Sequence, residues 1–142
     1  MRLFFVLAAG ALLLAGGAQA GDPGMRRAGL WQVTIIGPDG KPRPPRTYCY
    51  AARSIADSAK SFGTCSRNDV SKLGDTTTID ASCTNGAHQM SLHMTLTAMG
   101  ETAYHAKMHA TYSPPIAGMG AMDMVSDSKW LGPCPPGEKP VH

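Results

Sequence analysis

Apolar and polar residues alternate in the segment 30–36 of the chain. Trp31, Val33 and Ile35 fall at every second position there, with polar residues between them. A period of two predicts a β-strand with one buried face. A second short strand is expected over 46–50, after a loop that is rich in proline and glycine. The first half of the chain therefore begins with strands.

One helix is predicted after the second strand. From Ala51 onward, apolar residues recur at helical spacing, and Gly63 stands where the helix would stop. The apolar positions are Ala52, Ile55, Ala56, Ala59 and Phe62. Charged residues fall on the opposite face of this helix. The chain beyond Gly63 has the pattern of strands and turns.

Two turns that contain glycine set the expected register of the central strands. A two-residue turn at Asn85-Gly86 pairs Ala81 with Met90, Ile79 with Leu92 and Thr77 with Met94. A three-residue loop at Met99-Gly100-Glu101 pairs Leu96 with Tyr104, Met94 with Ala106, Leu92 with Met108 and Met90 with Ala110. Both turns place the same apolar residues on one face, and a slip of one residue would expose them. Their agreement predicts an antiparallel meander.

The first residues have the features of a secretory signal. Arg2 supplies a positive charge, an apolar run extends from Leu3 to Leu14, and Ala18-Gln19-Ala20 fits a small-x-small cleavage site. The apolar run is too short to span a bilayer. We expect residues 1–20 to be a signal peptide and the protein to be exported, either to the periplasm or into the medium.

The four cysteines of such an exported chain predict two disulfides. We favour Cys65–Cys83, which leaves Cys49 to pair with Cys134. The main rival pairs Cys49 with Cys65 across the helix, and the connectivity stays open at this point.

A hairpin at Gly74-Asp75 supports the favoured pairing, although counting back from its turn leaves Cys65 one residue out of step with Cys83. One extra residue near Asn68 and Asp69, a β-bulge, would bring both cysteines opposite each other on the inward face. The pairing therefore depends on a bulge in the strand before the hairpin.

Composition then limits the class of protein. The chain has 142 residues, of which 43% are hydrophobic and 16% charged, with a formal net charge of +3. These values exclude collagen-like, coiled-coil and strongly disordered classes, and they leave no large basic surface for nucleic acid. We expect a single β domain over 21–134 and a disordered, proline-rich tail over 135–142. The predicted fold class is mainly β: a curved antiparallel meander of about seven strands, half-open and barrel-like, with one short helix and two disulfides.

The methionines fall into two groups. One group lies on the inward face in the registers given above, and we interpret these residues as core filler; they are Met90, Met94 and Met108. The other lies by a glycine-rich loop and along the last predicted strand, 121–131; these residues are Met119, Met122 and Met124. Thioethers select Cu(I) over harder ions, so the second group is a candidate soft-metal site.

Three histidines form a second candidate metal site. We expect His93 to lie opposite Lys107 on the outward face, diagonal to His105 and His109. Three imidazoles could bind Zn²⁺ or Cu²⁺. Because the facing lysine would repel a cation, a solvated polar face is the interpretation that we favour.

Motifs of enzymes are missing from the sequence. It contains no Gly-x-Ser-x-Gly elbow, no His-Glu-x-x-His and no phosphate-binding Gly-x-x-x-x-Gly-Lys loop. We expect no catalytic residue, no cofactor and no enzymatic activity. The favoured function is a binding or structural module, and the alternative is a copper-binding protein that uses methionine and histidine ligands. The expected partner is a small apolar ligand or a protein, without nucleic acid or a membrane span, and the mature chain is expected to be a monomer.

Several landmarks occur in a characteristic order along the chain. They are Gly29-Leu30-Trp31-Gln32-Val33-Thr34, Cys49, the interval from Cys65 to Cys83 with Gly74 at its centre, and Leu131-Gly132-Pro133-Cys134. In this combination the chain resembles a family of exported bacterial proteins known only as a domain of unknown function, number 3617. The resemblance implies a small secreted or periplasmic protein with paired cysteines. It implies no activity, cofactor or catalytic residue.

Overall fold

The computed structural model describes residues 25–37 and 39–141, within which the chain forms nine strands and one 3-10 helix. The strands are β1 (Met25–Arg26), β2 (Gly29–Ile36), β3 (Arg46–Tyr50), β4 (Arg53–Ser54), β5 (Thr64–Leu73), β6 (Thr76–Asn85), β7 (His88–Ala98), β8 (Ala103–Ile116) and β9 (Met119–Gly132). The helix is η1 (Ile55–Phe62). The predicted signal peptide, residues 1–20, lies outside the described residues. Over the described ranges, no helix has both the length and the apolar character needed to cross a membrane.

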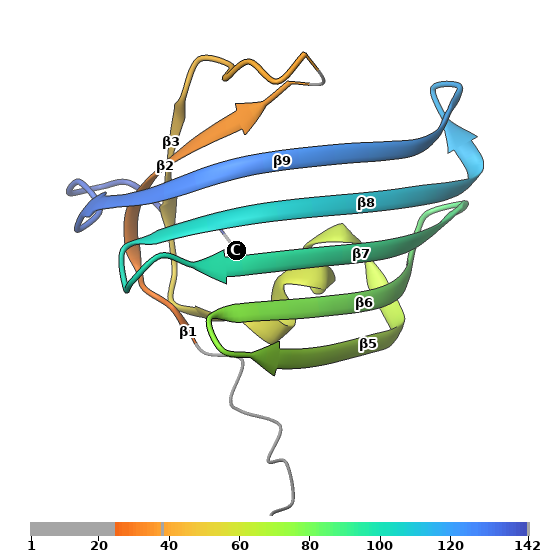
Figure 1. The fold of residues 1–142 in the computed structure, drawn as a ribbon, viewed down its shortest axis with the longest axis horizontal. Coiled ribbons are helices and arrows are strands. Elements are labelled where there is room, and N and C mark those ends of the chain that lie inside the picture. The colour runs from red at the N-terminus through yellow and green to blue at the C-terminus, as the bar shows by residue number, and fades with distance from the viewer. Residues whose placement is uncertain (1–24, 38, 142) are drawn as a thin grey trace, which may run out of the picture.

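Seven strands form one antiparallel sheet in the order β3-β2-β9-β8-β7-β6-β5. β1 and β4 form a separate two-stranded pair. Because β3 and β5 are edges, the sheet does not close into a barrel. Figure 1 shows the sheet curving, with β2 and β3 turned away from the long strands and η1 lying on the inner side. The expected fold class, a half-open antiparallel meander with one short helix, is confirmed.

The register of the first long hairpin agrees with the prediction. Cys65 lies opposite Cys83, and a bulge between Cys65 and Arg67 brings them into step. The extra residue is Ser66, closer to the cysteine than the expected position near Asn68 and Asp69. The Ser66 hydroxyl donates to the carbonyl oxygen of Ser82 at 3.3 Å, which gives the extra residue a partner on the neighbouring strand. The bulge was predicted correctly and its position was not.

The register of β6 with β7 and that of β7 with β8 each differ from the prediction by two residues. Asn85 pairs with His88, so the loop is Gly86-Ala87 instead of Asn85-Gly86. A type II′ turn needs a positive φ at its first central residue, and Gly86 has a φ of 60°. Asn85 therefore stays in the strand.

At the following turn, Ala98 pairs with Tyr104, so the loop is longer than three residues. Since side chains alternate with a period of two, a shift of two residues changes the partners but keeps every side chain on its face. The observed pairs include Ile79 with Met94, Ala81 with Leu92 and Met94 with Met108. The predicted buried face is right, and the predicted partners are wrong.

Both favoured disulfides are present, and the rival Cys49–Cys65 pairing is wrong. Cys65–Cys83 joins β5 to β6 with a Cα–Cα distance of 3.8 Å. Cys49–Cys134 joins β3 to the segment after β9 with a Cα–Cα distance of 5.5 Å. Further along, the backbone N–H of Val141 donates to the carbonyl oxygen of Cys49 at 2.8 Å, so the segment predicted as a disordered tail has a contact with β3.

The helix is confirmed, but it is shorter than predicted and of the 3-10 type. It begins at Ile55 because Arg53 and Ser54 pair with β1 as strand β4. It ends before Gly63, whose φ is 140°. A Cβ atom at Gly63 would lie 2.4 Å from the carbonyl oxygen of Thr84, so the end of the helix is pressed against β6.

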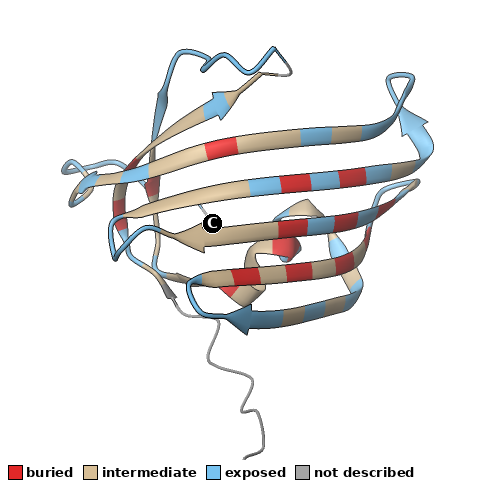
Figure 2. Cartoon of the chain, in the orientation of Figure 1, coloured by how far each residue is buried: buried red, intermediate tan, exposed pale blue. Residues whose placement is uncertain are grey.

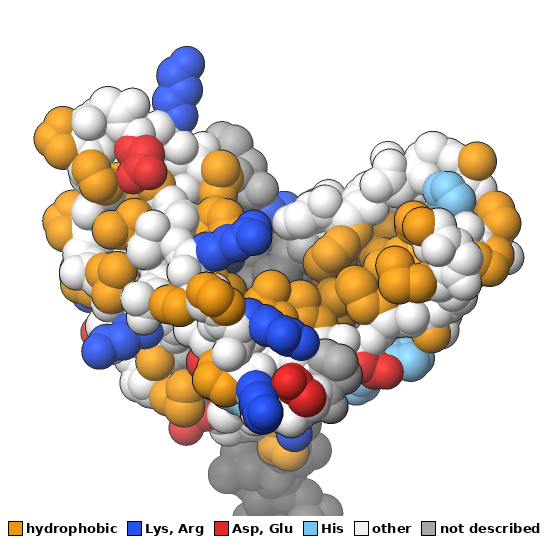
Figure 3. All heavy atoms as spheres, turned by 90° about the horizontal axis from the view of Figure 1, so that it is seen from above, with side chains coloured by type: hydrophobic (Ala, Val, Ile, Leu, Met, Phe, Trp, Pro, Cys, Tyr) orange, Lys and Arg blue, Asp and Glu red, His pale blue; other side chains and the backbone are white. Residues whose placement is uncertain are grey.

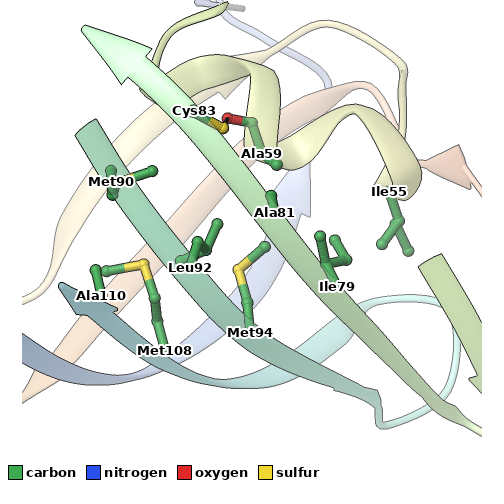
Figure 4. Packing of buried hydrophobic residues seen from close by; sticks show 10 residues of the cluster. All are labelled: Ile55, Ala59, Ile79, Ala81, Cys83, Met90, Leu92, Met94, Met108 and Ala110. Carbon is green, nitrogen blue, oxygen red and sulfur yellow. Dashed lines mark hydrogen bonds between the residues drawn. The ribbon is translucent and has the colours of Figure 1, made fainter. Parts of the chain in front are cut away.

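The hydrophobic core lies between η1 and the inner face of the meander. Its buried members come from η1, β6, β7 and β8, and they are Ile55, Ala59, Ile79, Ala81, Cys83, Met90, Leu92, Met94, Met108 and Ala110. Figure 4 shows these side chains converging beneath the helix, and Figure 2 shows the buried positions alternating with intermediate ones along β6 and with exposed ones along parts of β7 and β8. The inward placement predicted for Met90, Met94 and Met108 is confirmed.

Candidate ligand-binding cleft

The concave face of the sheet extends beyond the area that η1 covers. A cleft of about 250 Å³ lies there, lined by β2, β7, β8 and β9 together with residues of β1, β3, β4 and η1. Its apolar lining includes Trp31, Val33, Phe62, Met94, Leu96 and Met124. Figure 3 shows the molecule hollowed between two walls, with hydrophobic side chains along the hollow and Lys or Arg side chains beside it.

Two aromatic residues fix part of the cleft lining. Trp31 is 1% exposed, and its ring centroid lies 5.5 Å from that of Tyr104. Its indole N–H donates to the carbonyl oxygen of Arg27 at 2.9 Å, so the polar atom of this buried ring has a partner. The aromatic lining is thus held by packing and by a hydrogen bond.

Polar groups also face the cleft. Ser126 and Ser128 come from β9, and Ser58 and Ser61 come from η1. These hydroxyls can donate and accept hydrogen bonds. The cleft therefore differs from the core, since it offers polar contacts next to its apolar surface.

Two arginines lie at one end of the cleft, where β1 pairs with β4. The Arg26 guanidinium carbon is 3.8 Å from the centroid of the Tyr50 ring, and its Nε atom is buried without an acceptor. Arg53 donates to the carbonyl oxygen of Asp57 at 2.7 Å and to the hydroxyl of Ser61 at 2.8 Å.

Burial perturbs the ionisable groups at this end. It lowers the pKa of the Arg26 guanidinium; the Tyr50 phenol opposes this shift, and the nearby charge of Arg53 adds to it. Burial also raises the pKa of the Tyr50 phenol, and Arg26 partly offsets that effect. The end of the cleft is therefore a poorly hydrated place that holds positive charge.

A second hollow of about 430 Å³ lies beside the cleft, and the two share Val33. It is lined by β2, β3 and the loop between them, through Ile35, Arg43, Pro44 and Tyr48 among others. We take the smaller cleft as the candidate site because the sheet, the helix and the β1–β4 pair all contribute to it.

The histidines lie on the opposite, convex face, in a different arrangement from the one predicted. His93 is directly opposite His109, and Lys107 faces Thr95 instead. The cause is the two-residue change of register at the turn after β7. His105 lies opposite Thr97, four residue pairs further along the ladder.

Each of these histidines has a carboxylate partner on a neighbouring strand. The Nδ1 atoms of His93, His105 and His109 each lie 2.7 Å from an aspartate oxygen, of Asp80, Asp127 and Asp123 respectively. Cross-strand pairing explains these contacts, and the correct register would have revealed them from the sequence. Among the residues that the structure describes, no group of three or more His, Cys, Asp and Glu residues is arranged to hold a metal ion.

The three methionines of the candidate soft-metal site lie in different surroundings. Met119 is 54% exposed at the start of β9, while Met122 and Met124 are half-buried and pack against the core. Met124 also lines the cleft. Copper binding by these three residues stays a prediction, which a Cu(I) competition assay on Met122→Leu with Met124→Leu would test.

Comparisons with known proteins agree with the landmarks of the sequence. No curated protein and no solved structure shows significant similarity to the chain. One family model matches residues 26–134, which is most of the chain and includes all of the cleft and both disulfides. The chain therefore belongs to the family described as protein of unknown function (DUF3617).

Proposed function

We propose that this protein is a binding module, without enzymatic activity, that holds a small apolar ligand in the concave cleft. The observation that carries the proposal is that an apolar part of the concave face, around Val33, Leu96 and Met124, is left partly open beside the helix that buries the rest. A mostly apolar concave site with a few polar groups is the usual form of a small-molecule site.

The size and chemistry of the cleft support a small ligand. Its volume of about 250 Å³ lies just below the range for ligand pockets, roughly 300–1,000 Å³, which favours a small ligand. The flexible side chains of Met94 and Met124 can adapt to ligands of different shape. Since the cleft opens to solvent at its side, a longer chain could extend from it (Figure 3).

The proposal includes export to the periplasm or the medium, and action as a monomer. Two disulfides support export, because such bonds persist in oxidising compartments. The signal-like pattern of residues 1–20 adds independent support from the sequence.

Blocking the cleft tests the proposal. Ala106 lines the cleft on β8, whereas Ala121 is exposed on β9. We expect wild-type protein and Ala121→Phe to bind decanol in isothermal titration calorimetry, and we expect Ala106→Phe to lose that binding while keeping the wild-type circular dichroism spectrum. Failure of the wild type to bind either decanol or its charged analogues with the same chain, or equal binding by both variants, would refute the proposal.

A second candidate function is binding of a divalent metal on the convex face, at His93 and His109. The specific observation is that each Nδ1 lies against an aspartate oxygen. A Nδ1–H that donates to a carboxylate leaves Nε2 of the neutral ring free as a ligand, as in many metal sites. A Zn²⁺ titration of wild type against His93→Gln tests this function, and equal affinity would rule it out.

A further inference from the structure

The polar end of the cleft carries two positive charges, and none of the described residues that line it is acidic. Arg26 and Arg53 both line the cleft, and both also line a smaller hollow of about 30 Å³ next to it. Their guanidinium groups are close enough for the charge of Arg53 to lower the pKa of Arg26. Like charges gathered beside apolar surface destabilise each other unless an anion lies between or beside them.

The ion pairs among the described residues include neither arginine. Arg53 is held by the backbone carbonyl of Asp57 and by the hydroxyl of Ser61, and both of these acceptors are uncharged. The carboxylate of Asp57 is paired with Lys60 instead. The Asp57 carboxylate also interacts with the charge of Arg53 over a longer distance, so that charge is partly offset but has no direct ion pair among the described residues.

Among the described residues, Arg26 has still fewer partners. Its guanidinium stacks on Tyr50, and its buried Nε has no acceptor. A cation that is partly removed from water without a counter-charge lowers the stability of the fold, and an anion bound next to it would relieve that cost. Arg27, one residue further along, stacks on Trp130 and does not line the cleft, so the two neighbouring arginines have different positions.

We propose that the ligand of the cleft is an amphipathic anion: an apolar chain lies along Leu96, Tyr104 and Met124, and a carboxylate or phosphate head group lies at the end formed by Arg26 and Arg53. This inference rests on the proposed function and names the class of its ligand. Guanidinium groups bind both head groups through charge-assisted hydrogen bonds. The apolar chain of the ligand would contact the apolar residues that line the rest of the cleft.

Probes that share one chain and differ in head group test the inference. Calorimetry at neutral pH would compare decanoate, decyl phosphate, decanol and decyltrimethylammonium, each below its aggregation limit. We expect at least one anionic probe to bind about tenfold or more tightly than decanol, and the cationic probe to bind most weakly. The tighter of the two anions identifies the head group.

Variants of the arginines supply the matched control. Arg26→Gln and Arg53→Gln should each reduce the advantage of the anion over decanol by several-fold. Arg67→Gln should leave it unchanged, because Arg67 is exposed, pairs with Asp69 and lies outside the cleft. In wild-type protein, added salt should weaken binding of the anion and leave decanol unaffected, a readout that needs no variant.

Three outcomes separate the inference from the function on which it rests. Equal affinity for decanol and both anions, insensitive to salt and to Arg53→Gln, would overturn the inference and leave an apolar binding module. Tightest binding of the cationic probe would also overturn it. Failure of all four probes to bind would overturn the proposed function and the inference together.

Discussion

The concave face of this sheet has two halves that share one strand pattern and differ in what lies over them. Under η1, alternating residues of β6, β7 and β8 are almost fully buried; Ile79 and Ala110 are both 0% exposed. Beside it, the corresponding positions of β9 remain partly open, as Met124 and Ser128 do. The comparison shows that period-two alternation specifies an inward face, while the position of one short helix decides which part becomes core and which part a cleft.

The two halves also differ in polar content. The covered half is mostly apolar, with Thr77 and the Asn68 amide as polar groups, whereas Arg26, Arg53 and Ser126 line the open half. Unpaired charges beneath the helix would destabilise the fold strongly, because burial without partners is costly. In the open half, Arg26 and Arg53 keep part of their contact with water, so their charges cost less there.

The largest expected effect comes from the disulfide that joins β3 to the segment after β9. Replacing Cys49 and Cys134 by serine removes a crosslink with a sequence separation of 85, and should lower the free energy of unfolding by about 4 kcal/mol. Replacing Cys65 and Cys83, separated by 18, should lower it by about 3 kcal/mol. Urea titrations would compare the two. A larger loss from the shorter crosslink would contradict the expected order.

The next largest effect is expected from shortening one apolar side chain in each half and comparing the losses in unfolding free energy. Leu92 is 3% exposed under the helix, so Leu92→Ala should cost about 3 kcal/mol. Met124 is half-buried in the open half, so Met124→Ala should cost about 1 kcal/mol. Equal losses in chemical denaturation would show that the open half is packed as tightly as the covered one.

A glycine in the open half should show a smaller effect. Gly29 has a φ of 139°, and a Cβ there would lie 2.3 Å from Trp130 Nε1. Gly29→Ala should therefore destabilise the fold by about 2 kcal/mol. Gly74→Ala is the control, since its φ is also positive while its Cβ would meet nothing within 4 Å. If both variants lose the same stability, close approach of β2 to β9 has no energetic role.

The smallest effect concerns the surface of the helix. A side-chain hydrogen bond from Lys60 lowers the pKa of the Asp57 carboxyl. A lowered pKa stabilises the fold above the unfolded-state value, about 3.9, and that contribution disappears as the pH falls through the folded-state value. Asp57→Asn should therefore have a slightly lower urea midpoint than wild type at pH 7, with the two midpoints converging in acid. A constant difference across pH would exclude this linkage.

The sequence predicted much of the covered half, because strong local signals determine it. Glycine turns, alternation and paired cysteines specify strands, faces and crosslinks even when the partners are wrong by two residues. The type II′ turn at Gly86 decided the actual register, and a preference for Asn-Gly could not show which residue would begin the loop. The Asp80–His93 pair was missed for the same reason, while the other two Asp–His pairs depend on the register of β8 with β9, which the sequence did not predict.

The polar end of the cleft could not be predicted. Arg26 stands in a short polar segment before β2, and Arg53 lies within the segment predicted as helix. Two-residue strands such as β1 and β4 carry no periodic signal. Only the three-dimensional pairing of Arg26 with Arg53 brings the two charges together.

Methionine methyl groups offer the most direct test of the central claim, that the open half of the concave face binds a ligand. NMR of protein labelled at the methionine methyls would follow Met124 and Met94 in the cleft, Met90 in the covered core and the exposed Met119 during a titration with decanoate. The account predicts saturable shifts at Met124 and Met94, with Met90 and Met119 unchanged. Shifts centred on Met119, or none at Met124 at saturating decanoate, would contradict it.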